Sequence, residues 1–177
     1  MAKNEKFRQL LDIKNDYNPK VKKMEDVEIV LRFFALGFES NYTTYSNIGL
    51  ESFLSNYMDT MNTRIKKEPM LLQKLEEDFV EVIDYIDANF DSNAFSKYNE
   101  TRITKFNKAA FDALAISIYV EFDRVKNVRI SDDFKTAHKD LFFNNDLFIK
   151  SINGATASTT KTQRRITTVR ELLIEKF

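Results

Sequence analysis

The stretch Asp26-Val27-Glu28-Ile29-Val30-Leu31-Arg32-Phe33-Phe34-Ala35-Leu36 decides the fold of this chain. On a helix, its apolar side chains cover most of the circumference, whereas a surface helix carries only one apolar stripe. A helix of this kind is buried on several sides. Residues 25–37 therefore predict a central helix around which the other helices pack, with Gly37 at its end.

Glu28 and Arg32 are the charged residues inside this stretch. They lie four residues apart, so they share one face of the helix and can pair there. A charged pair in an apolar helix is either a buried structural bridge or the floor of a functional site, and we favour the structural pair. If both partners are truly buried, the loss of one should cost about 3–5 kcal/mol.

The composition is that of a globular, helical protein. The 177 residues are 43% hydrophobic and 31% charged, which suits a single domain spanning residues 1–177 with a substantial core. Only 3 Gly and 2 Pro occur, too few for the frequent turns of a many-stranded β fold. The 16 Phe and 7 Tyr indicate an aromatic core. We predict an all-α, multi-helix bundle of about six to eight helices around the central one.

Apolar residues recur at intervals of three and four along most of the chain. This period, with Asn107, either Ser131 or Asp132, and either Asn144 or Asn145 as candidate caps, predicts helices over residues 5–11, 25–37, 50–65, 69–90, 107–124, 131–142, 144–152 and 163–176. No capping residue precedes Met1-Ala2-Lys3, which resembles the interior of a helix. We therefore expect the chain to be the C-terminal part of a longer one, as an excised domain or a natural truncation.

Several kinds of active site are excluded by the residue types. The chain has no Cys, and His138 is its single His, so His-based triads and the usual zinc sites lack their ligands. We expect His138 to be an ordinary surface residue. No glycine-rich phosphate loop occurs. The sequence thus predicts no catalytic residue, no metal site and no cofactor. It has no apolar run of membrane-spanning length, and we expect a cytoplasmic protein without membrane contact.

The charge is distributed unevenly along the chain. Residues 1–24 hold seven basic and three acidic side chains, and residues 161–177 hold five and two, whereas residues 68–91 hold one and eight. The acidic side chains oppose the apolar stripe of their predicted helix. They form either a solvated face or a contact surface for a basic partner.

Two clusters of basic residues are candidates for nucleic-acid binding. The first consists of Lys20, Lys22 and Lys23, and the second of Lys161, Arg164, Arg165 and Arg170. The second follows a segment rich in Ser and Thr and opens the last predicted helix. Hydroxyl groups, basic side chains and a helix N-terminus together suit phosphate contacts. The alternative is a flexible loop with no ligand.

Four blocks of residues follow one another in a familiar order. They are Phe7-Arg8-Gln9-Leu10-Leu11, Asp26-x-Glu28-x-x-Leu31-Arg32-Phe33-x-Ala35, Leu50-x-x-Phe53-Leu54-x-x-Tyr57-Met58 and Phe106-Asn107-Lys108-Ala109-x-Phe111-Asp112-Ala113-Leu114, with Thr156, Arg165-Ile166 and Val169 near the end. This succession resembles the helical C-terminal half of the large protein family that includes the GmrSD-type modification-dependent restriction endonucleases. The resemblance covers nearly the whole chain.

The resemblance implies a role in DNA restriction or phage defence. Members of that family begin with a ParB/sulfiredoxin-like domain, whose Asp-Gly-Gln-Gln-Arg motif serves nucleotide hydrolysis and DNA processing, and many have a His-Asn-His nuclease domain or subunit. This sequence has neither motif. We expect a non-catalytic helical module that braces the missing domain and contacts duplex DNA, with Glu28, Arg32 and Asn107 as framework residues. The alternatives are a protein–protein docking module and, least favoured, a nucleotide hydrolase.

Overall fold

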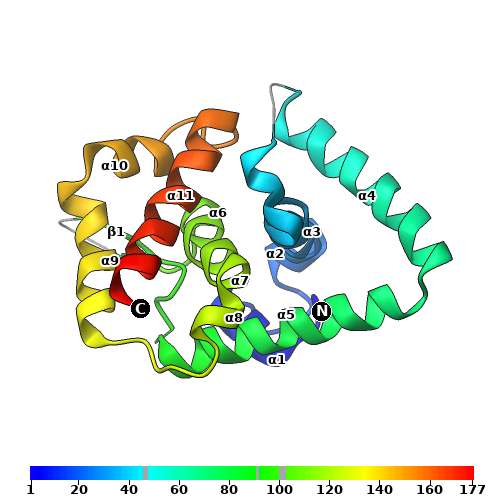
Figure 1. Cartoon of the computed structure of the whole chain (residues 1–177), viewed down its shortest axis with the longest axis horizontal. Helices are drawn as coiled ribbons and strands as arrows, with labels where there is room; N and C mark the ends of the chain where they lie inside the picture. Colours follow the sequence, from blue (N-terminus) through cyan, green and yellow to red (C-terminus); the bar gives the residue numbers. More distant parts are fainter. Residues whose placement is uncertain (46–47, 91, 100–102) are drawn as a thin grey trace.

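The computed structural model describes residues 1–45, 48–90, 92–99 and 103–177, which form helices and one small hairpin (Figure 1). The α-helices are α1 (Glu5–Leu10), α2 (Pro19–Lys22), α3 (Glu25–Gly37), α4 (Leu50–Lys67), α5 (Met70–Asn89), α6 (Lys108–Phe111), α7 (Ser117–Val120), α8 (Phe122–Val125), α9 (Asp132–Asn144), α10 (Asp146–Ile152) and α11 (Thr159–Lys176). The other elements are the 3₁₀ segment η1 (Phe38–Thr43), the π-helical turn η2 (Asp112–Ile116) and the antiparallel strands β1 (Lys97–Tyr98) and β2 (Ile103–Thr104). The predicted all-α class is confirmed.

The helical segments outnumber the six to eight expected, for local reasons. The predicted helix over residues 107–124 is divided into α6, η2, α7 and α8. The Asn18-Pro19 turn begins the short helix α2, where the Asn18 side chain accepts a hydrogen bond from the Lys20 amide. Segments this short escape a periodicity argument because they contain too few residues to show a period.

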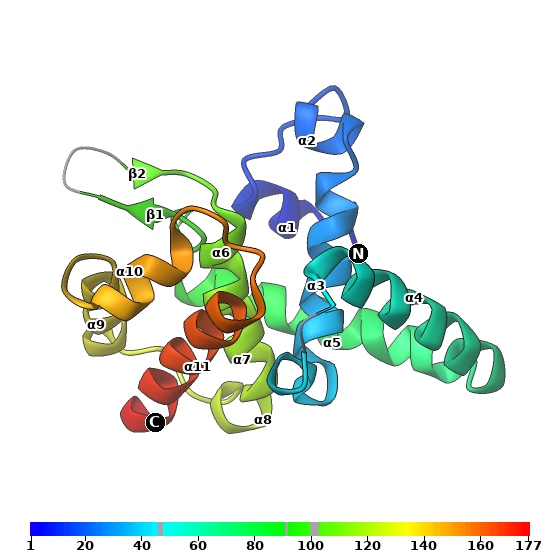
Figure 2. The ribbon, with the colours of Figure 1, turned by 90° about the horizontal axis from the view of Figure 1, so that it is seen from above.

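Helix α3 lies in the middle of the molecule, as predicted. It packs against α2, α4, η1, η2 and α7, between the α4–α5 pair and the α6–α7 segment (Figure 2). Its burial is concentrated in the second half, from Arg32 to Gly37. Gly37 is the last residue of the helix, and a close approach favours glycine there: a Cβ atom would lie 2.5 Å from Cδ1 of Tyr119. Any larger side chain would push this ring away.

The core is aromatic, as the composition indicates. Phe79 of α5 lies with its ring centroid 5.1 Å from that of Phe7 and 5.3 Å from that of Phe33, both in edge-to-face geometry. Phe111 extends the cluster towards Phe95, at 4.8 Å. Such pairs contribute about 0.5–1.5 kcal/mol each beyond the burial of their surface. These contacts join α1, α3, α5 and α6 around one hydrophobic core.

Helices α4 and α5 form a hairpin that extends away from the rest of the molecule (Figure 2). Carboxylates of α5 point outward: Glu76, Glu77 and Glu81 are exposed. This placement agrees with the solvated face expected for residues 68–91. Two of the carboxylates bind the N-terminal segment, Glu76 to the Met1 amino group at 3.5 Å and Asp84 to Lys6 at 3.0 Å.

The N-terminal helix is capped, contrary to the sequence prediction. The Oδ1 atom of Asn4 accepts a hydrogen bond from the Phe7 amide at 2.9 Å, and α1 begins at Glu5. Met1, Ala2 and Lys3 therefore precede the helix and do not belong to its interior. The prediction failed because it considered only residues before Met1 as caps and overlooked Asn4, although Asn is among the best N-caps.

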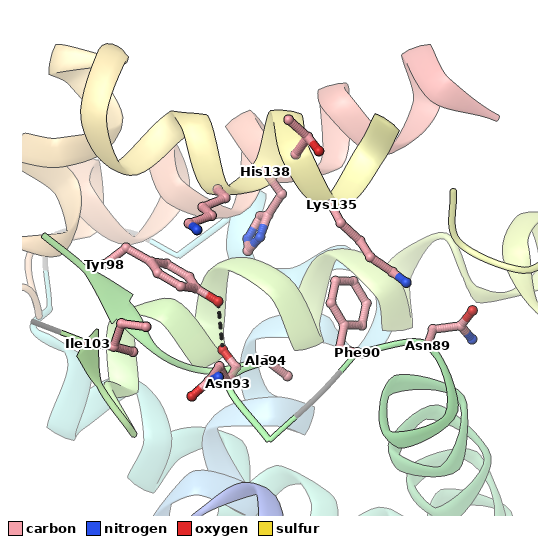
Figure 3. A pocket seen from close by; sticks show the side chains of 10 residues that line it. Asn89, Phe90, Asn93, Ala94, Tyr98, Ile103, Lys135 and His138 are labelled. Carbon is pink, nitrogen blue, oxygen red and sulfur yellow. Dashed lines mark hydrogen bonds between the residues drawn. The ribbon is translucent and has the colours of Figure 1, made fainter. Parts of the chain in front are cut away.

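His138 is buried, so its prediction as a surface residue is wrong. The imidazole extends from α9 (Figure 3), and only 5% of the residue is exposed. Its ring stacks on Phe134 with centroids 6.0 Å apart and an interplanar angle of 6°. Phe142, four residues further on, and Phe90 of the preceding segment meet the ring edge-on. Burial lowers the pKa of His138 to about 4, so the imidazole is neutral at pH 7.

No helix among the ranges described above combines the length and the apolar character needed to cross a lipid bilayer.

Candidate functional site

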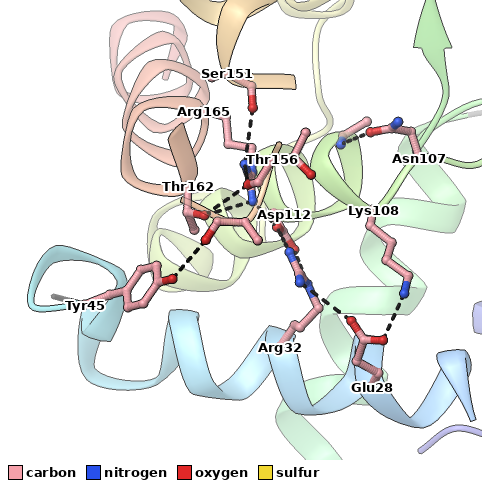
Figure 4. A network of polar contacts seen from close by, with 12 residues as sticks. Glu28, Arg32, Tyr45, Asn107, Lys108, Asp112, Ser151, Thr156, Thr162 and Arg165 are labelled. Carbon is pink, nitrogen blue, oxygen red and sulfur yellow. Dashed lines mark hydrogen bonds and ion pairs between the residues drawn. The ribbon is translucent and has the colours of Figure 1, made fainter. Parts of the chain in front are cut away.

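Three charged side chains from distant parts of the sequence meet at the centre of the molecule. Arg32 of α3 donates from Nε to Asp112 Oδ1 at 3.1 Å and from Nη2 to Asp112 Oδ2 (Figure 4). Arg165 of α11 donates from Nη2 to the same Oδ2 atom at 2.6 Å. Asp112 thus receives two arginines, one from each side, and all three residues are buried. We call this set the Arg32–Asp112–Arg165 cluster.

Local sequence explains why Asp112 reaches this position. Asn107 caps α6 by accepting a hydrogen bond from the Ala110 amide at 3.0 Å. The helix then widens into the π-helical turn that starts at Asp112. π-Turns of this kind occur often at functional sites because the wider turn shifts the direction of its side chains. Ser117, after the turn, donates to the Ile166 carbonyl at 2.9 Å and joins this segment to α11.

Arg165 is held by more than the carboxylate. Its Nη1 donates to the Thr156 carbonyl at 2.7 Å and to the Ser151 carbonyl at 3.3 Å, and its Nη2 also donates to Thr162 Oγ1 at 3.1 Å. The cluster therefore fixes the loop between α10 and α11 as well as the helices. On the other side of this loop, Tyr45 donates from its hydroxyl to the Ala157 carbonyl at 3.0 Å.

Glu28 stands at the edge of the cluster, not inside it. Its Oε1 lies 3.7 Å from Arg32 Nη1, which confirms the predicted i, i+4 pairing, but 39% of the Glu28 side chain is exposed. Its other oxygen accepts from Lys108 Nζ at 2.9 Å. The expectation of a pair buried on both sides is thus wrong: the buried partner of Arg32 is Asp112. Sequence spacing finds neighbours along one helix and does not find partners on another.

The electrostatics of the cluster keep Asp112 ionised. Burial raises the pKa of this carboxyl, but the charges and hydrogen bonds of Arg32 and Arg165 outweigh burial and hold its pKa below the ordinary value. The two arginines remain protonated at any physiological pH. With Glu28, the group contains two positive and two negative charges. This balance is what allows charged residues to persist in an apolar interior.

The geometry of the cluster is that of a framework and not of a reaction centre. Asp112 and Arg165 have no exposed surface, so no substrate atom can approach either of them. A hollow of about 490 Å³ between α3 and α4 is lined by Glu28, Arg32 and apolar residues such as Leu54 and Met58. The Arg32 guanidinium is almost wholly buried, and its Nε and Nη2 atoms donate to Asp112. These two donors are therefore not available to a ligand in the hollow.

The first predicted basic cluster, on and directly after α2, is partly available at the surface. Lys22 and Lys23 are exposed. Lys20 is engaged within the chain: its Nζ donates to the Leu11 carbonyl at 2.8 Å and lies 5.3 Å from the centre of the Phe106 ring.

The second predicted basic cluster is largely engaged. Arg165, taken from sequence as a nucleic-acid contact, is instead buried in the polar cluster, because it lies on the inward face of α11 together with Ile166 and Val169. Lys161 donates to the Asn153 carbonyl at 2.8 Å. Arg170 donates to Glu121 Oε1 at 2.6 Å and to the Tyr42 hydroxyl at 3.2 Å. Arg164 is half-exposed.

Sequence reasoning missed the role of Asp112. A signal existed, since Asp112 is the single charged residue within the apolar stretch 109–118. A charge in such a stretch requires a buried partner of opposite sign. The two arginines that satisfy it lie 80 and 53 positions away, and no local pattern identifies them.

No protein-family model, curated protein or solved structure matches the chain. Within the part of the chain that the structure covers, no three His, Asp or Glu side chains converge in a way that could hold a metal ion.

Proposed function

We propose that this chain is a non-catalytic helical module of a cytoplasmic DNA restriction or phage-defence protein of the GmrSD type. In this role it braces a nucleotide-hydrolysing ParB-like domain, in a system that has a His-Asn-His nuclease domain or subunit. The module contacts duplex DNA through its surface lysines. Its own residues carry no chemistry.

One observation supports this proposal above the others: the residues that carry the family resemblance meet in space. Glu28 and Arg32 come from one block, Lys108 and Asp112 from another, and Arg165 from the last, yet all five form one connected network (Figure 4). A shared motif whose members brace three separate helices is a motif for a common framework. Buried charge networks of this type set geometry more reliably than they add stability.

The contact with DNA rests on the exposed basic residues. Lys22 is the last residue of α2 and Lys23 follows it, and no carboxylate of the described residues pairs with either. Arg164 faces outward near the start of α11. Phosphate contacts of this kind give affinity without sequence specificity, and they weaken as counterions compete at higher salt.

The alternative is a protein–protein docking module, and the α4–α5 hairpin favours it. A groove of about 720 Å³ along this hairpin and η1 is lined by carboxylates, including Glu68, Glu77 and Glu81, and by the exposed Met70. Such a surface suits a basic partner with an apolar anchor. In this reading the chain does not bind nucleic acid.

The salt dependence of duplex DNA binding separates the two proposals. For the DNA-contacting module we expect the affinity to fall steeply between 50 and 200 mM salt, by about 0.9 logarithmic units per phosphate contact for each tenfold change in salt. The double variant Lys22→Ala/Lys23→Ala should reduce this slope by about 2. The matched control, Lys66→Ala/Lys67→Ala on the exposed end of α4, should keep it. Absence of binding at low salt supports the docking module instead.

The family assignment has a separate test. We expect the coding sequence next to the first codon to encode an Asp-Gly-Gln-Gln-Arg motif, in the same reading frame or in a partner gene. A neighbourhood without this motif would contradict the restriction-system role. The purified chain should also not hydrolyse ATP or GTP. Hydrolysis that persists through repurification and disappears in Arg32→Ala would instead support the nucleotide-hydrolase alternative.

A further inference from the structure

A second polar feature, distinct from the central cluster, lies between α9, the end of α5 and the β1–β2 hairpin. There a cavity of about 380 Å³ is lined by Phe90, Tyr98, Lys135, His138 and Lys139, among others (Figure 3). Pockets for small molecules begin at about 300 Å³. The cavity is therefore large enough for one small ligand.

The imidazole of His138 is the unusual group of this cavity. It extends from α9 towards the space between Tyr98 and Phe90 (Figure 3), and its buried Nε2 atom has no hydrogen-bond partner within the described chain. A buried polar atom without a partner costs about 1–3 kcal/mol. Three aromatic rings surround the imidazole and offer it no acceptor or donor of ordinary strength.

The walls and the mouth of the cavity define the chemistry of this ligand. Phe90 and Tyr98 supply flat apolar walls. Lys135 and Lys139 lie one helical turn apart on α9 beside them, and the described lining contains no carboxylate. The contacts that Lys135 and Lys139 make are weak: Lys135 lies 3.4 Å from the fully exposed Asp132, and Lys139 lies 5.4 Å from the centre of the Tyr98 ring.

A ligand that matches these groups has a planar heteroaromatic ring with a hydrogen-bonding edge, joined to an anionic group. We propose that the cavity binds a 5′-mononucleotide, with its base between the aromatic walls and His138, and its phosphate at Lys135 and Lys139. Aromatic rings stack on any base, and a lysine pair suits a phosphate. This inference stands independently of the proposed role in DNA restriction.

Because His138 is the only histidine of the chain, its imidazole NMR signals can be identified without further assignment. We would label the imidazole with ¹⁵N and titrate the protein with AMP, GMP, CMP and UMP at pH 7, following the two ring resonances. At least one mononucleotide should shift them saturably. Adenosine and ribose 5-phosphate each lack half of the ligand, and both should bind at least tenfold more weakly than the best mononucleotide.

Variants connect the binding to the cavity. Lys135→Ala/Lys139→Ala should weaken binding at least tenfold, while Lys66→Ala/Lys67→Ala should leave it unchanged. His138→Phe keeps an aromatic ring but removes the nitrogen atoms, so calorimetry should show weaker binding by a protein of unchanged circular dichroism. If this variant does not fold, the lysine variant alone still tests the site.

Three results would overturn the proposal. The first is the absence of a saturable shift with any of the four mononucleotides at several millimolar. The second is binding of ribose 5-phosphate as tight as that of the best mononucleotide, or binding of that mononucleotide by Lys135→Ala/Lys139→Ala as tight as by the wild type. The third is a shift caused by a single-stranded decanucleotide but by no mononucleotide, which would assign the site to a nucleic-acid strand.

Discussion

Asp112 and His138 are both polar residues buried in an apolar, helical molecule, and they differ in how their polar atoms are satisfied. Asp112 receives hydrogen bonds from two arginines that approach from two other helices. His138 is surrounded by aromatic rings, and its Nε2 atom has no partner within the described chain. Asp112 is charged, with its pKa held down by its neighbours, whereas burial keeps His138 neutral.

The difference separates a framework from a binding site. A polar group with all its partners inside the protein has no capacity left for a ligand, and its role is to hold helices together. A polar group without a partner is costly unless a ligand satisfies it. Both Asp112 oxygens accept hydrogen bonds, and the carboxylate is fully buried. Arg165 Nε has no partner among the described residues, but Arg165 has no exposed side-chain surface, whereas His138 borders a cavity. The ligand is therefore expected at the second site and not at the first.

The largest effect is expected from Asp112→Ala. This change leaves the buried Arg32 and Arg165 side by side without their shared anion, so the free energy of unfolding should fall by about 3–5 kcal/mol or more. Urea denaturation followed by circular dichroism measures it. Asp59→Ala, at an exposed position of α4, is the control and should change stability by no more than about 0.5 kcal/mol. If Asp112→Ala lowered the free energy of unfolding by less than about 1 kcal/mol, the cluster would not be what holds these helices together.

The next effect is a dependence of stability on pH that comes from His138. Its pKa is about 4 in the folded protein, against an ordinary value of 6.5. Between these pH values the unfolded chain binds more protons, so this contribution is complete above pH 6.5 and is lost as the pH falls to 4. It amounts to about 3 kcal/mol. The stability that Asp112 contributes is lost only at still lower pH, because its folded pKa lies below the ordinary value of an Asp.

The measurement for His138 is urea denaturation at several pH values, in the wild type and in His138→Phe. Carboxylates also titrate near pH 4, and the difference between the two proteins isolates the imidazole. The variant should lose the part of the slope between pH 4 and 6.5 that the wild type shows. Parallel pH profiles for the two proteins would place the imidazole in contact with water.

The smallest effect is expected from Glu28→Gln. Because 39% of this side chain is exposed and its partners lie at the surface end of the cluster, the loss should stay under about 1 kcal/mol. Arg32→Met is the comparison and should cost several times more, since it removes one of the two cations that hold Asp112. If both variants cost the same, the pair along α3, and not the contact between helices, would be the structural one.

The sequence predicted the helical elements well and the environment of their polar residues poorly. The spacing of apolar residues located α3, α4, α5 and α9 to within a few residues. Asn107 caps a helix as expected, and Ser131 and Asn145 are the caps at the two positions where Asp132 and Asn144 were the alternatives. Periodicity and capping depend on residues within one or two turns of each other, which a sequence shows directly.

The failures concern residues whose position depends on another element. His138 has Phe134 and Phe142 four residues away on either side, a pattern that indicates an inward face, but its charged neighbours in sequence suggested the surface. Arg165 was grouped with Arg164, although adjacent helical residues point in directions about 100° apart. In both cases composition was given more weight than helical geometry.

By itself, the sequence determined that the chain is helical, where most helices begin and end, and that the interior is aromatic, because these properties follow from local spacing and residue type. Only the tertiary structure decided which charges are buried, which partners satisfy them and which buried polar atoms, His138 Nε2 among them, are left without one. The reason is physical: the free energy of a buried charge or hydrogen-bonding group depends on the groups around it, and here those groups come from distant segments of the chain.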